Sequence, residues 1–308
     1  MADLRARLPL LEQRSRRPPH DPLAINTALS SYYRRGLQAK QLHERRRQLE
    51  HQITAARERE GLQLAEQQQL LDRVPESEIL QRRADALLSQ PRPSRDSIDE
   101  AQALYRQARK LRRSGAAITP RLEQHRCRLA ALETSLTFLE QAESLEQIEA
   151  LAAELEEQLG RRRSGHRQNR RLDSAGRGQP QALELRSPGG LALLVGRNHR
   201  QNDWIAFRQA RRGDLWFHAQ ELPGSHVMLK SSEAPADDAD LQAAADLAAH
   251  FSRGRSNRRV PVVMVPSDEL QRIPGASPGT VRHRGGAVIW GVPQRALTLL
   301  ASRPHEQR

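Results

Sequence analysis

The apolar residues of the N-terminal half are sparse and widely spaced. From about Pro22 to Leu71 they stand among Gln, Glu and Arg, and Leu37, Leu42, Leu49 and Ile53 follow one another at intervals of 5, 7 and 4 residues. This pattern predicts one long helix with a loose heptad-like seam. A long solvated helix without a partner is the alternative interpretation.

A second helical segment follows a stretch marked by Pro75, Pro91 and Pro93. Proline removes a helix donor and restricts the preceding residue, so the chain is expected to reverse here. Ser97-Ile98-Asp99-Glu100 has the form of a capping box and predicts a helix from Ser97 to about Ala142. Gly115 and Pro120 are expected to kink or split that helix. Its apolar stripe consists of Leu122, Leu129, Leu132, Leu136 and Leu139.

A third, short helix is predicted after Ser144, which forms a second capping-box pattern with Gln147, and it should end at Gly160. Each apolar stripe needs a partner to leave water. Residues 24–160 are therefore expected to form an antiparallel coiled-coil arm.

The pattern changes in the last third to short apolar runs separated by turn signals. Two helices are also predicted there: Asp203–Ala210 behind an Asn202 cap, and Asp240–Phe251 behind Asp237 and Asp238. This alternation predicts a small mixed domain, so the fold class is α+β. The expected strands are Leu183–Leu185, Leu191–Val195, Leu215–His218, His226–Leu229, Val260–Val265 and Ala287–Trp290.

The predicted organisation has five parts. Residues 1–23 form an irregular segment rich in Arg and Pro, residues 24–160 form the arm, and residues 161–180 form a basic linker. The linker's low hydrophobicity predicts disorder in isolation, and its arginines could order on RNA. Residues 181–302 form the mixed domain, and residues 303–308 form a tail.

Charge adds a possible partner to this picture. The 308 residues carry a net charge of +13, with 3% aromatic residues. Residues 1–160 hold 26 Lys and Arg against 24 Asp and Glu, residues 161–178 hold 7 against 1, and residues 179–308 hold 17 against 12. The excess therefore lies in the linker and the mixed domain. Arginine suits bidentate phosphate contacts, and solubility or a GC-rich genome is the alternative explanation.

Cys127 is the only cysteine, which excludes an intramolecular disulfide and a cysteine metal cluster. No stretch has the length and apolarity of a signal peptide or a membrane span. We therefore expect a cytoplasmic protein with no membrane partner.

The rarer residues gather in four islands of the mixed domain. These are Gly196-Arg197-Asn198, Gln201-Asn202-Asp203-Trp204, Asp214-Leu215-Trp216-Phe217-His218 and Pro223-Gly224-Ser225-His226-Val227. The polar loop with Asn198, Gln201 and Asn202 offers donors for phosphates or base edges. Alternatively, Asn202 and Asp203 only cap a helix and Asn198 only holds the loop together. Trp204, Trp216 and Phe217 either stack on bases or fill the core.

Catalysis and metal binding find little support in these islands. Ser225, His218 and Asp214 could form a triad, but Pro223-Gly224-Ser225-His226-Val227 lacks the second glycine of a nucleophile elbow. His218, His226 and Asp214 could bind a metal, but no short histidine spacing supports it. We expect no catalytic centre, no metal and no cofactor.

The predicted RNA contacts are basic or amide side chains of the mixed domain. Arg208, Arg211 and Arg212 lie on or just past one predicted helix, so at least two can face the same way. The full set is Arg197, Asn198, Arg200, Gln201, Asn202, Arg208, Arg211, Arg212, Lys230, Arg253, Arg258 and Arg259.

The four islands, continued by Ala243–Ala249, Val260-Pro261-Val262 and Pro278-Gly279-Thr280-Val281, resemble the NFACT RNA-binding domain from about Leu183 to Val292. The residues that carry the resemblance include Asp203, Asp214, Trp216, His218, Pro223, Gly224, Ser225 and His226. The domain closes proteins of the RqcH type, which act in ribosome-associated quality control. The family also has a coiled-coil arm before this domain, and the arm here is similar in element order.

The resemblance implies binding to the large ribosomal subunit, with its rRNA and also tRNA as partners, and rescue of stalled nascent chains. The family's N-terminal domain, whose Asp-Arg pair is tied to tRNA handling, is expected to be absent. An Asp-Arg dipeptide occurs at Asp72-Arg73, but in the arm. A separate chain that supplies the missing domains is therefore a further expected partner.

Two other hypotheses remain open. The arm could serve as a protein-interaction scaffold, because members of this family have been labelled fibronectin-binding proteins. The chain could also be a truncated or split family member, which an in-frame continuation before Met1 would reveal.

Overall fold

The computed structural model describes residues 22–160 and 180–301. The predicted irregular segment, the linker arginines and the tail lie outside these residues, apart from a few at their edges. The chain divides into two compact units, residues 1–48 and 49–308. In the first unit, the described residues form the N-terminal half of helix α2, where Tyr33 and Leu37 are exposed. The contacts described below lie within the second unit.

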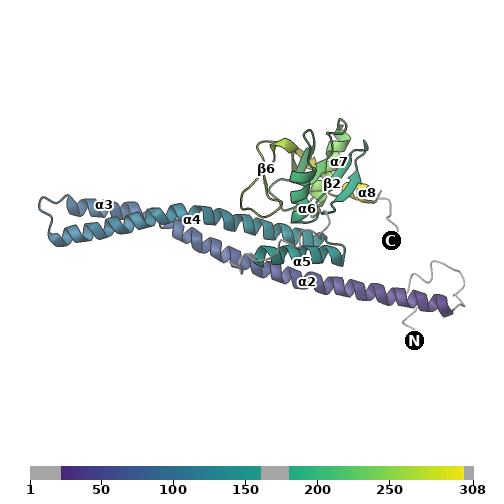
Figure 1. Cartoon of the computed structure of the whole chain (residues 1–308), viewed down its shortest axis with the longest axis horizontal. Helices are drawn as coiled ribbons and strands as arrows, with labels where there is room; N and C mark the ends of the chain where they lie inside the picture. Colours follow the sequence, from purple (N-terminus) through teal and green to yellow (C-terminus); the bar gives the residue numbers. More distant parts are fainter. Residues whose placement is uncertain (1–21, 161–179, 302–308) are drawn as a thin grey trace. The chain divides into compact units, whose positions relative to one another are not determined.

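In the described residues before the mixed domain, the chain forms helices α2 to α5 (Figure 1). No helix of the described chain is both long and apolar enough to cross a bilayer. Their bounds are α2 (Pro22–Asp72), α3 (Glu76–Leu88), α4 (Arg95–Gln141) and α5 (Leu145–Gly160).

Helix α4 runs antiparallel to α3 and to the end of α2. Arg83 of α3 contacts Glu100 at 2.6 Å, and Glu60 of α2 contacts His125 at 2.7 Å. Residues nearer the N-terminus of the chain in α2 and α3 therefore contact residues nearer the C-terminus of α4, as in an antiparallel pair. Leu49 and Ile53 are buried, as a packed seam requires. The predicted fold class, with its long helical arm, is confirmed.

The start predicted for α4 is wrong, and the helix is not split at Gly115 or Pro120. The helix begins at Arg95, and its cap is Ser94, whose hydroxyl accepts the Ser97 N–H at 3.1 Å. Ser94 follows Pro93 with an extended backbone, so the cap can lie three residues before the predicted one. The helix also continues unbroken through Pro120, which is exposed. Water can therefore satisfy the carbonyl that the proline ring leaves without a donor.

Gly115 serves close packing between helices. A Cβ at this position would lie 3.1 Å from Val74 Cγ2, so the missing side chain lets the turn between α2 and α3 approach α4. Downstream, Ser144 accepts the Gln147 N–H at 3.3 Å and Gln147 accepts the Glu143 N–H at 2.8 Å. The start predicted for the third helix is therefore confirmed, with the reciprocal bond shifted by one residue.

The mixed domain is built on a six-stranded antiparallel sheet in the order β1-β2-β4-β3-β5-β8. The six predicted strands are all present. A second sheet of two short strands, β6 and β7, was not predicted, because strands of two residues show no alternation. The bounds are β1 (Leu183–Arg186), β2 (Ala192–Val195), β3 (Leu215–Ala219), β4 (Val227–Leu229), β5 (Val260–Pro266), β6 (Gln271–Arg272), β7 (Val281–Arg282) and β8 (Ala287–Gly291).

Helices cover one face of the large sheet. The alanine-rich helix α7 (Asp238–His250) packs on this face, and Asp237 and Asp240 form a complete capping box at its start. The side chains of Phe217, Val227 and Leu229 are fully buried beneath it. Helix α8 (Ala296–Ala301) extends the same core through the fully buried Ala296.

The second face is covered over its middle strands. Trp216, Met228 and Val265 lie under helix α6 (His199–Trp204) and the π-helical turn η1 (Ile205–Gln209). The predicted helix Asp203–Ala210 is present as the end of α6 and η1, but its predicted start behind Asn202 is wrong: α6 begins four residues earlier, capped by Asn198. Short 3-10 turns, η2 (Arg253–Ser256) and η3 (Ser267–Glu269), flank β5.

Candidate nucleic-acid interface

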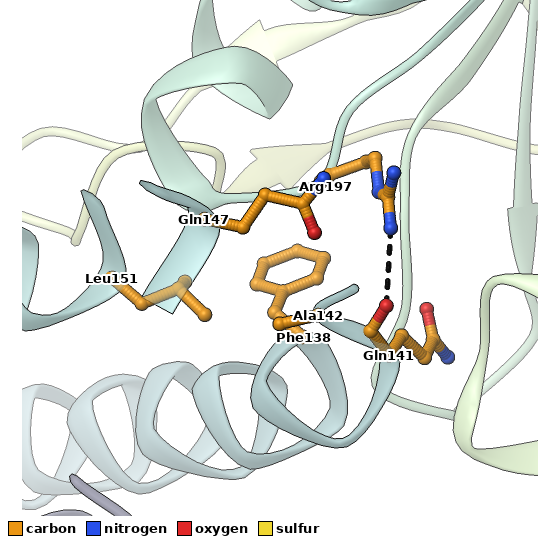
Figure 2. Close-up of a pocket in the computed structure, with 6 residues that line it drawn as sticks. All are labelled: Phe138, Gln141, Ala142, Gln147, Leu151 and Arg197. Atoms are coloured by element: carbon orange, nitrogen blue, oxygen red, sulfur yellow. Dashed lines mark hydrogen bonds between the residues drawn. The ribbon is translucent and has the colours of Figure 1, made fainter. Parts of the chain in front are cut away.

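The GRN island lies against the end of the helical arm. The Arg197 guanidinium donates to the Gln141 carbonyl at 3.0 Å and contacts Glu143 at 3.4 Å, so its side chain is only 14% exposed. Figure 2 shows Arg197 beside a small pocket that Phe138, Ala142 and Leu151 also line. In this arrangement Arg197 joins the domain to α4, although we predicted it as an RNA contact.

The start of α6 is held by a buried carboxylate. Glu154 of α5 accepts the backbone N–H groups of His199 at 3.2 Å and Arg200 at 3.1 Å, and the Arg200 side chain pairs with Glu157. A carboxylate at a helix N-terminus satisfies donors that have no partner within the helix. Burial nevertheless raises the pKa of Glu154 to about 7, more than these hydrogen bonds lower it.

His199 completes this contact. Its Nε2 lies 2.8 Å from the Ser135 hydroxyl, and its ring meets the Phe138 ring edge to face. Burial lowers the pKa of His199 to about 4, so the imidazole is neutral at pH 7. Sequence reasoning missed both His199 and Glu154, since neither stands in a motif that marks a contact between elements.

The amide residues of the islands form hydrogen bonds within the domain. Asn198 accepts the Gln201 N–H at 2.8 Å as the cap of α6, and Gln201 accepts the Arg197 N–H at 2.7 Å. Asn202 is buried and accepts the His226 N–H at 3.0 Å. A Cβ at Gly196 would lie 2.1 Å from Asn202 Oδ1, so this position requires glycine. These contacts support the alternative in which the amides tie the loop.

Lys230 and Asp214 form a buried ion pair rather than part of a surface. The carboxylate binds the Lys230 ammonium and accepts the Ser232 N–H at 3.1 Å and the Arg211 N–H at 2.8 Å. Burial by itself raises the pKa of Asp214, but these hydrogen bonds outweigh it and hold the pKa below its usual range. Lys230 was a predicted RNA contact, but in this buried ion pair its ammonium group cannot bind a phosphate.

Asp203 ties α6 to the two-stranded sheet. It forms a two-fold contact with Arg272 of β6, at 2.7 and 3.0 Å. The Arg272 guanidinium also lies 4.2 Å from the centroid of the Phe207 ring. This family-motif residue thus holds the segment that covers the second face of the large sheet.

The remaining motif residues form an aromatic cluster on that face. The Trp216 ring stacks on His218 at 5.5 Å between centroids, His226 meets His218 edge to face at 5.4 Å, and His283 lies 5.6 Å from Trp216. Trp216 Nε1, Ser225 Oγ and His226 Nδ1 are buried without a hydrogen-bond partner in the part of the chain that the structure describes. Orphaned buried polar atoms are uncommon and mark places where water or a ligand binds.

Burial keeps two histidines of this cluster neutral. It lowers the pKa of His218 to about 4 and that of His226 well below its usual value. Asp214 is bound by Lys230, so it does not accompany His218 and Ser225 as a triad or His218 and His226 as metal ligands. Among residues 22–160 and 180–301 no group of histidine, cysteine and acidic side chains has a metal-binding arrangement.

The turn after β3 is fixed by backbone contacts. The Pro223 carbonyl accepts the Arg253 N–H at 2.8 Å, and Gly224 pairs with Ser252 in an isolated bridge. The PGSHV island and η2 therefore lie side by side.

Exposed arginines form two groups at opposite ends of β5. Arg208, Arg211 and Arg212 precede β3, whose first residue Leu215 pairs with Pro266 at the end of β5. The second group, Arg253, Arg255, Arg258 and Arg259, directly precedes β5 at Val260. The seven residues of β5 separate the groups by about 20 Å. Sequence reasoning missed Arg255, Arg282 and Arg284, although short basic runs around them were a usable signal.

Comparison with known proteins identifies the domain. The family model described as the NFACT protein RNA binding domain matches residues 183–285, and the model of the NFACT N-terminal and middle domains matches residues 92–173. Two regions of the chain therefore match models of NFACT domains. The second match falls on α4, α5 and the residues that follow them.

The relatives that the chain resembles are RqcH proteins. It is 34% identical to the Rqc2 homolog RqcH of Streptococcus suis over 185 residues, 60% of this chain and 32% of that protein. It is 37% identical to the Rqc2 homolog RqcH of Bacillus subtilis over 107 residues, 35% of this chain and 18% of that protein. The chain thus spans a third or less of the length of the curated relatives it matches.

A solved structure shares this architecture. It is the C-terminal part of the fibronectin/fibrinogen-binding protein from Streptococcus suis, with a TM-score of 0.68 and 26% identity. The match covers 84% of this chain and 98% of that one.

Proposed function

We propose that this chain is an RNA-binding part of a ribosome quality-control protein of the RqcH type, acting in the cytoplasm on the large ribosomal subunit. Its partners are large-subunit rRNA and tRNA. The proposal assigns the chain no catalytic step.

The observation that carries the proposal is the pair of exposed arginine groups on the NFACT RNA-binding domain. Arg208, Arg212, Arg258 and Arg259 are exposed, and no carboxylate of the described chain lies within ion-pair distance of them. Unpaired guanidinium groups release the counterions of a phosphate backbone when they bind it. Arg197 and Arg200 instead contact the arm, and this contact supports a role for the arm in placing the domain.

Sedimentation tests the proposal. Tagged protein in a cell lysate at low salt is expected to migrate with free large subunits through a sucrose gradient. A variant with Arg258→Glu and Arg259→Glu is expected to shift toward the top. Wild-type protein found only at the top of the gradient would contradict binding to the subunit.

A second candidate is a protein-interaction scaffold of the fibronectin-binding kind. The solved structure named for fibronectin and fibrinogen binding covers most of this chain, arm included. Binding of nuclease-treated protein to immobilised fibronectin, abolished by removal of the arm helices, is the outcome that would favour it.

A further inference from the structure

The second face of the large sheet is left open along its edge strand. On β8, Val288 is 49% exposed and Trp290 is 56% exposed, whereas Ile289 between them packs into the core on the helix-covered face. Strand alternation thus places Val288 and Trp290 on the second face. The cover of that face, α6, η1 and the residues near Leu270 and Val281, lies over the middle strands.

The register shows what surrounds these two side chains. Val288 pairs with Val263, which pairs with His218, and Trp290 pairs with Pro261. Val263 is buried, so the exposed strip on this face consists of Val288 and Trp290, two residues apart on β8. His218, on the far side of Val263, is partly exposed and stacks on Trp216.

Positive charge lies at the Trp290 end of this strip. Arg258 and Arg259 directly precede Val260, whose cross-strand partner Gly291 follows Trp290. Arg253 and Arg255 stand on the neighbouring turn η2, which contacts Pro223 of the PGSHV island. Among the described residues, no carboxylate forms an ion pair with Arg253, Arg255, Arg258 or Arg259, so their positive charge is not neutralised there.

We infer that the strip of Trp290 and Val288 is a stacking platform for an unpaired base of single-stranded RNA, with the phosphates held by Arg258 and Arg259. The inference rests on the proposed RNA-binding function and assigns it a place and a class of RNA. Every base has a π face that can stack on an indole ring, and a duplex keeps its bases stacked internally and does not offer them. An exposed tryptophan beside arginines is complementary to a base and its phosphates.

The test compares Trp290→Ala with Trp290→Phe in the full chain. Anisotropy of a labelled single-stranded RNA and of a duplex of equal length measures affinity. We expect Trp290→Ala to weaken single-strand binding about tenfold or more, because removal of the partner of one stacked base has this effect. Trp290→Phe should stay within a few-fold of wild type, and duplex binding should not change. Tyr33→Ala, which removes an exposed ring from α2, is the matched control.

Tryptophan emission adds an independent readout. Trp290 is exposed whereas Trp216 is buried, so stacking of a base should quench emission in the wild type and much less in Trp290→Phe. A thermal unfolding midpoint like that of wild type would show that Trp290→Ala is folded.

Two kinds of failure are distinguishable. If wild-type protein binds neither RNA, the proposed function fails. If wild type binds single strands and Trp290→Ala binds them equally well, the platform is wrong while RNA binding stands. A second copy of the chain on this strip would also overturn the inference, and sedimentation velocity would reveal it as self-association that Trp290→Ala abolishes.

Discussion

At the residue scale, Lys230 and Asp214 show how a charged pair can belong to the core. Both side chains are buried, and the carboxylate has four protein donors. Removing one member of such a pair leaves the other charge buried without compensation, which costs more than the pair contributes.

We therefore predict that Lys230→Met lowers the free energy of unfolding by about 3–5 kcal/mol. The double variant Lys230→Met with Asp214→Asn should recover part of this loss, because no charge is then left unpaired. Urea unfolding followed by circular dichroism measures both. A Lys230→Met protein of unchanged stability but lower RNA affinity would return Lys230 to the RNA contacts.

The caps of α4 and α6 were both predicted at the wrong residue, and for the same physical reason. Ser97 and Asn202 are good capping residues, but Ser94 and Asn198 occupy the caps because the helices begin three and four residues earlier. Capping preference depends on the local backbone, and the sequence offers several competent residues within a few positions. Packing of the following helix decides among them.

At the element scale, the start of α6 depends on a side chain from α5. Glu154 bridges two backbone donors of α6, and its pKa is raised to about 7 by burial. The folded state therefore keeps the Glu154 proton to a higher pH than the unfolded state, whose pKa is near the usual 4.5. By linkage, this group's contribution to stability is fully present below pH 4.5 and is lost as pH rises to about 7.

We predict that Glu154→Gln removes this pH dependence. The free energy of unfolding of wild type minus that of the variant should fall by about 3 kcal/mol as pH rises through this window and then level off. Urea unfolding at a series of pH values measures it. His199 and His218 destabilise the fold as pH falls from 6.5 toward 4, but they are present in both proteins and cancel in the difference. If the difference in the free energy of unfolding between wild type and Glu154→Gln does not vary with pH, the raised pKa of Glu154 is contradicted.

The strands of the mixed domain were predictable because each one alternates or is wholly apolar. Val260–Pro266 and Ala192–Val195 are examples, with buried side chains on both faces of β2. The π-helical turn η1 was not predictable, since its backbone bonds depend on how Ile205 packs on the second face of the sheet. Such turns are frequent at functional sites. This one contains Arg208 and is followed by Arg211 and Arg212.

At the scale of the whole molecule, the two arginine groups are separated by the length of β5. They can therefore contact different phosphates of one RNA, and each should contribute its own share of the salt dependence. The sequence placed them 40 or more residues apart and could not show whether they meet.

We predict that Arg211→Glu with Arg212→Glu, and separately Arg258→Glu with Arg259→Glu, each lower RNA affinity and flatten its dependence on salt. The slope of log affinity against log salt should decrease in magnitude by about 0.7 for each phosphate of a single strand that the variant no longer neutralises. Filter binding over a range of salt concentrations measures it. Arg106→Glu with Arg109→Glu, on the exposed side of α4, controls for net charge. If reversing one of the two predicted pairs leaves the slope unchanged, that pair does not bind phosphate.

The sequence by itself determined the long helices, the six strands, the α+β class and the resemblance to the NFACT RNA-binding domain, because these follow from local periodicity and from residues close together in the chain. Only the tertiary structure decided which polar residues face solvent. Arg197, Arg200, Asn202 and Lys230 bind partners that lie 16 to 56 residues away in the chain, namely Gln141, Glu157, His226 and Asp214. Burial of a charge depends on partners brought together by folding, and no local pattern records them.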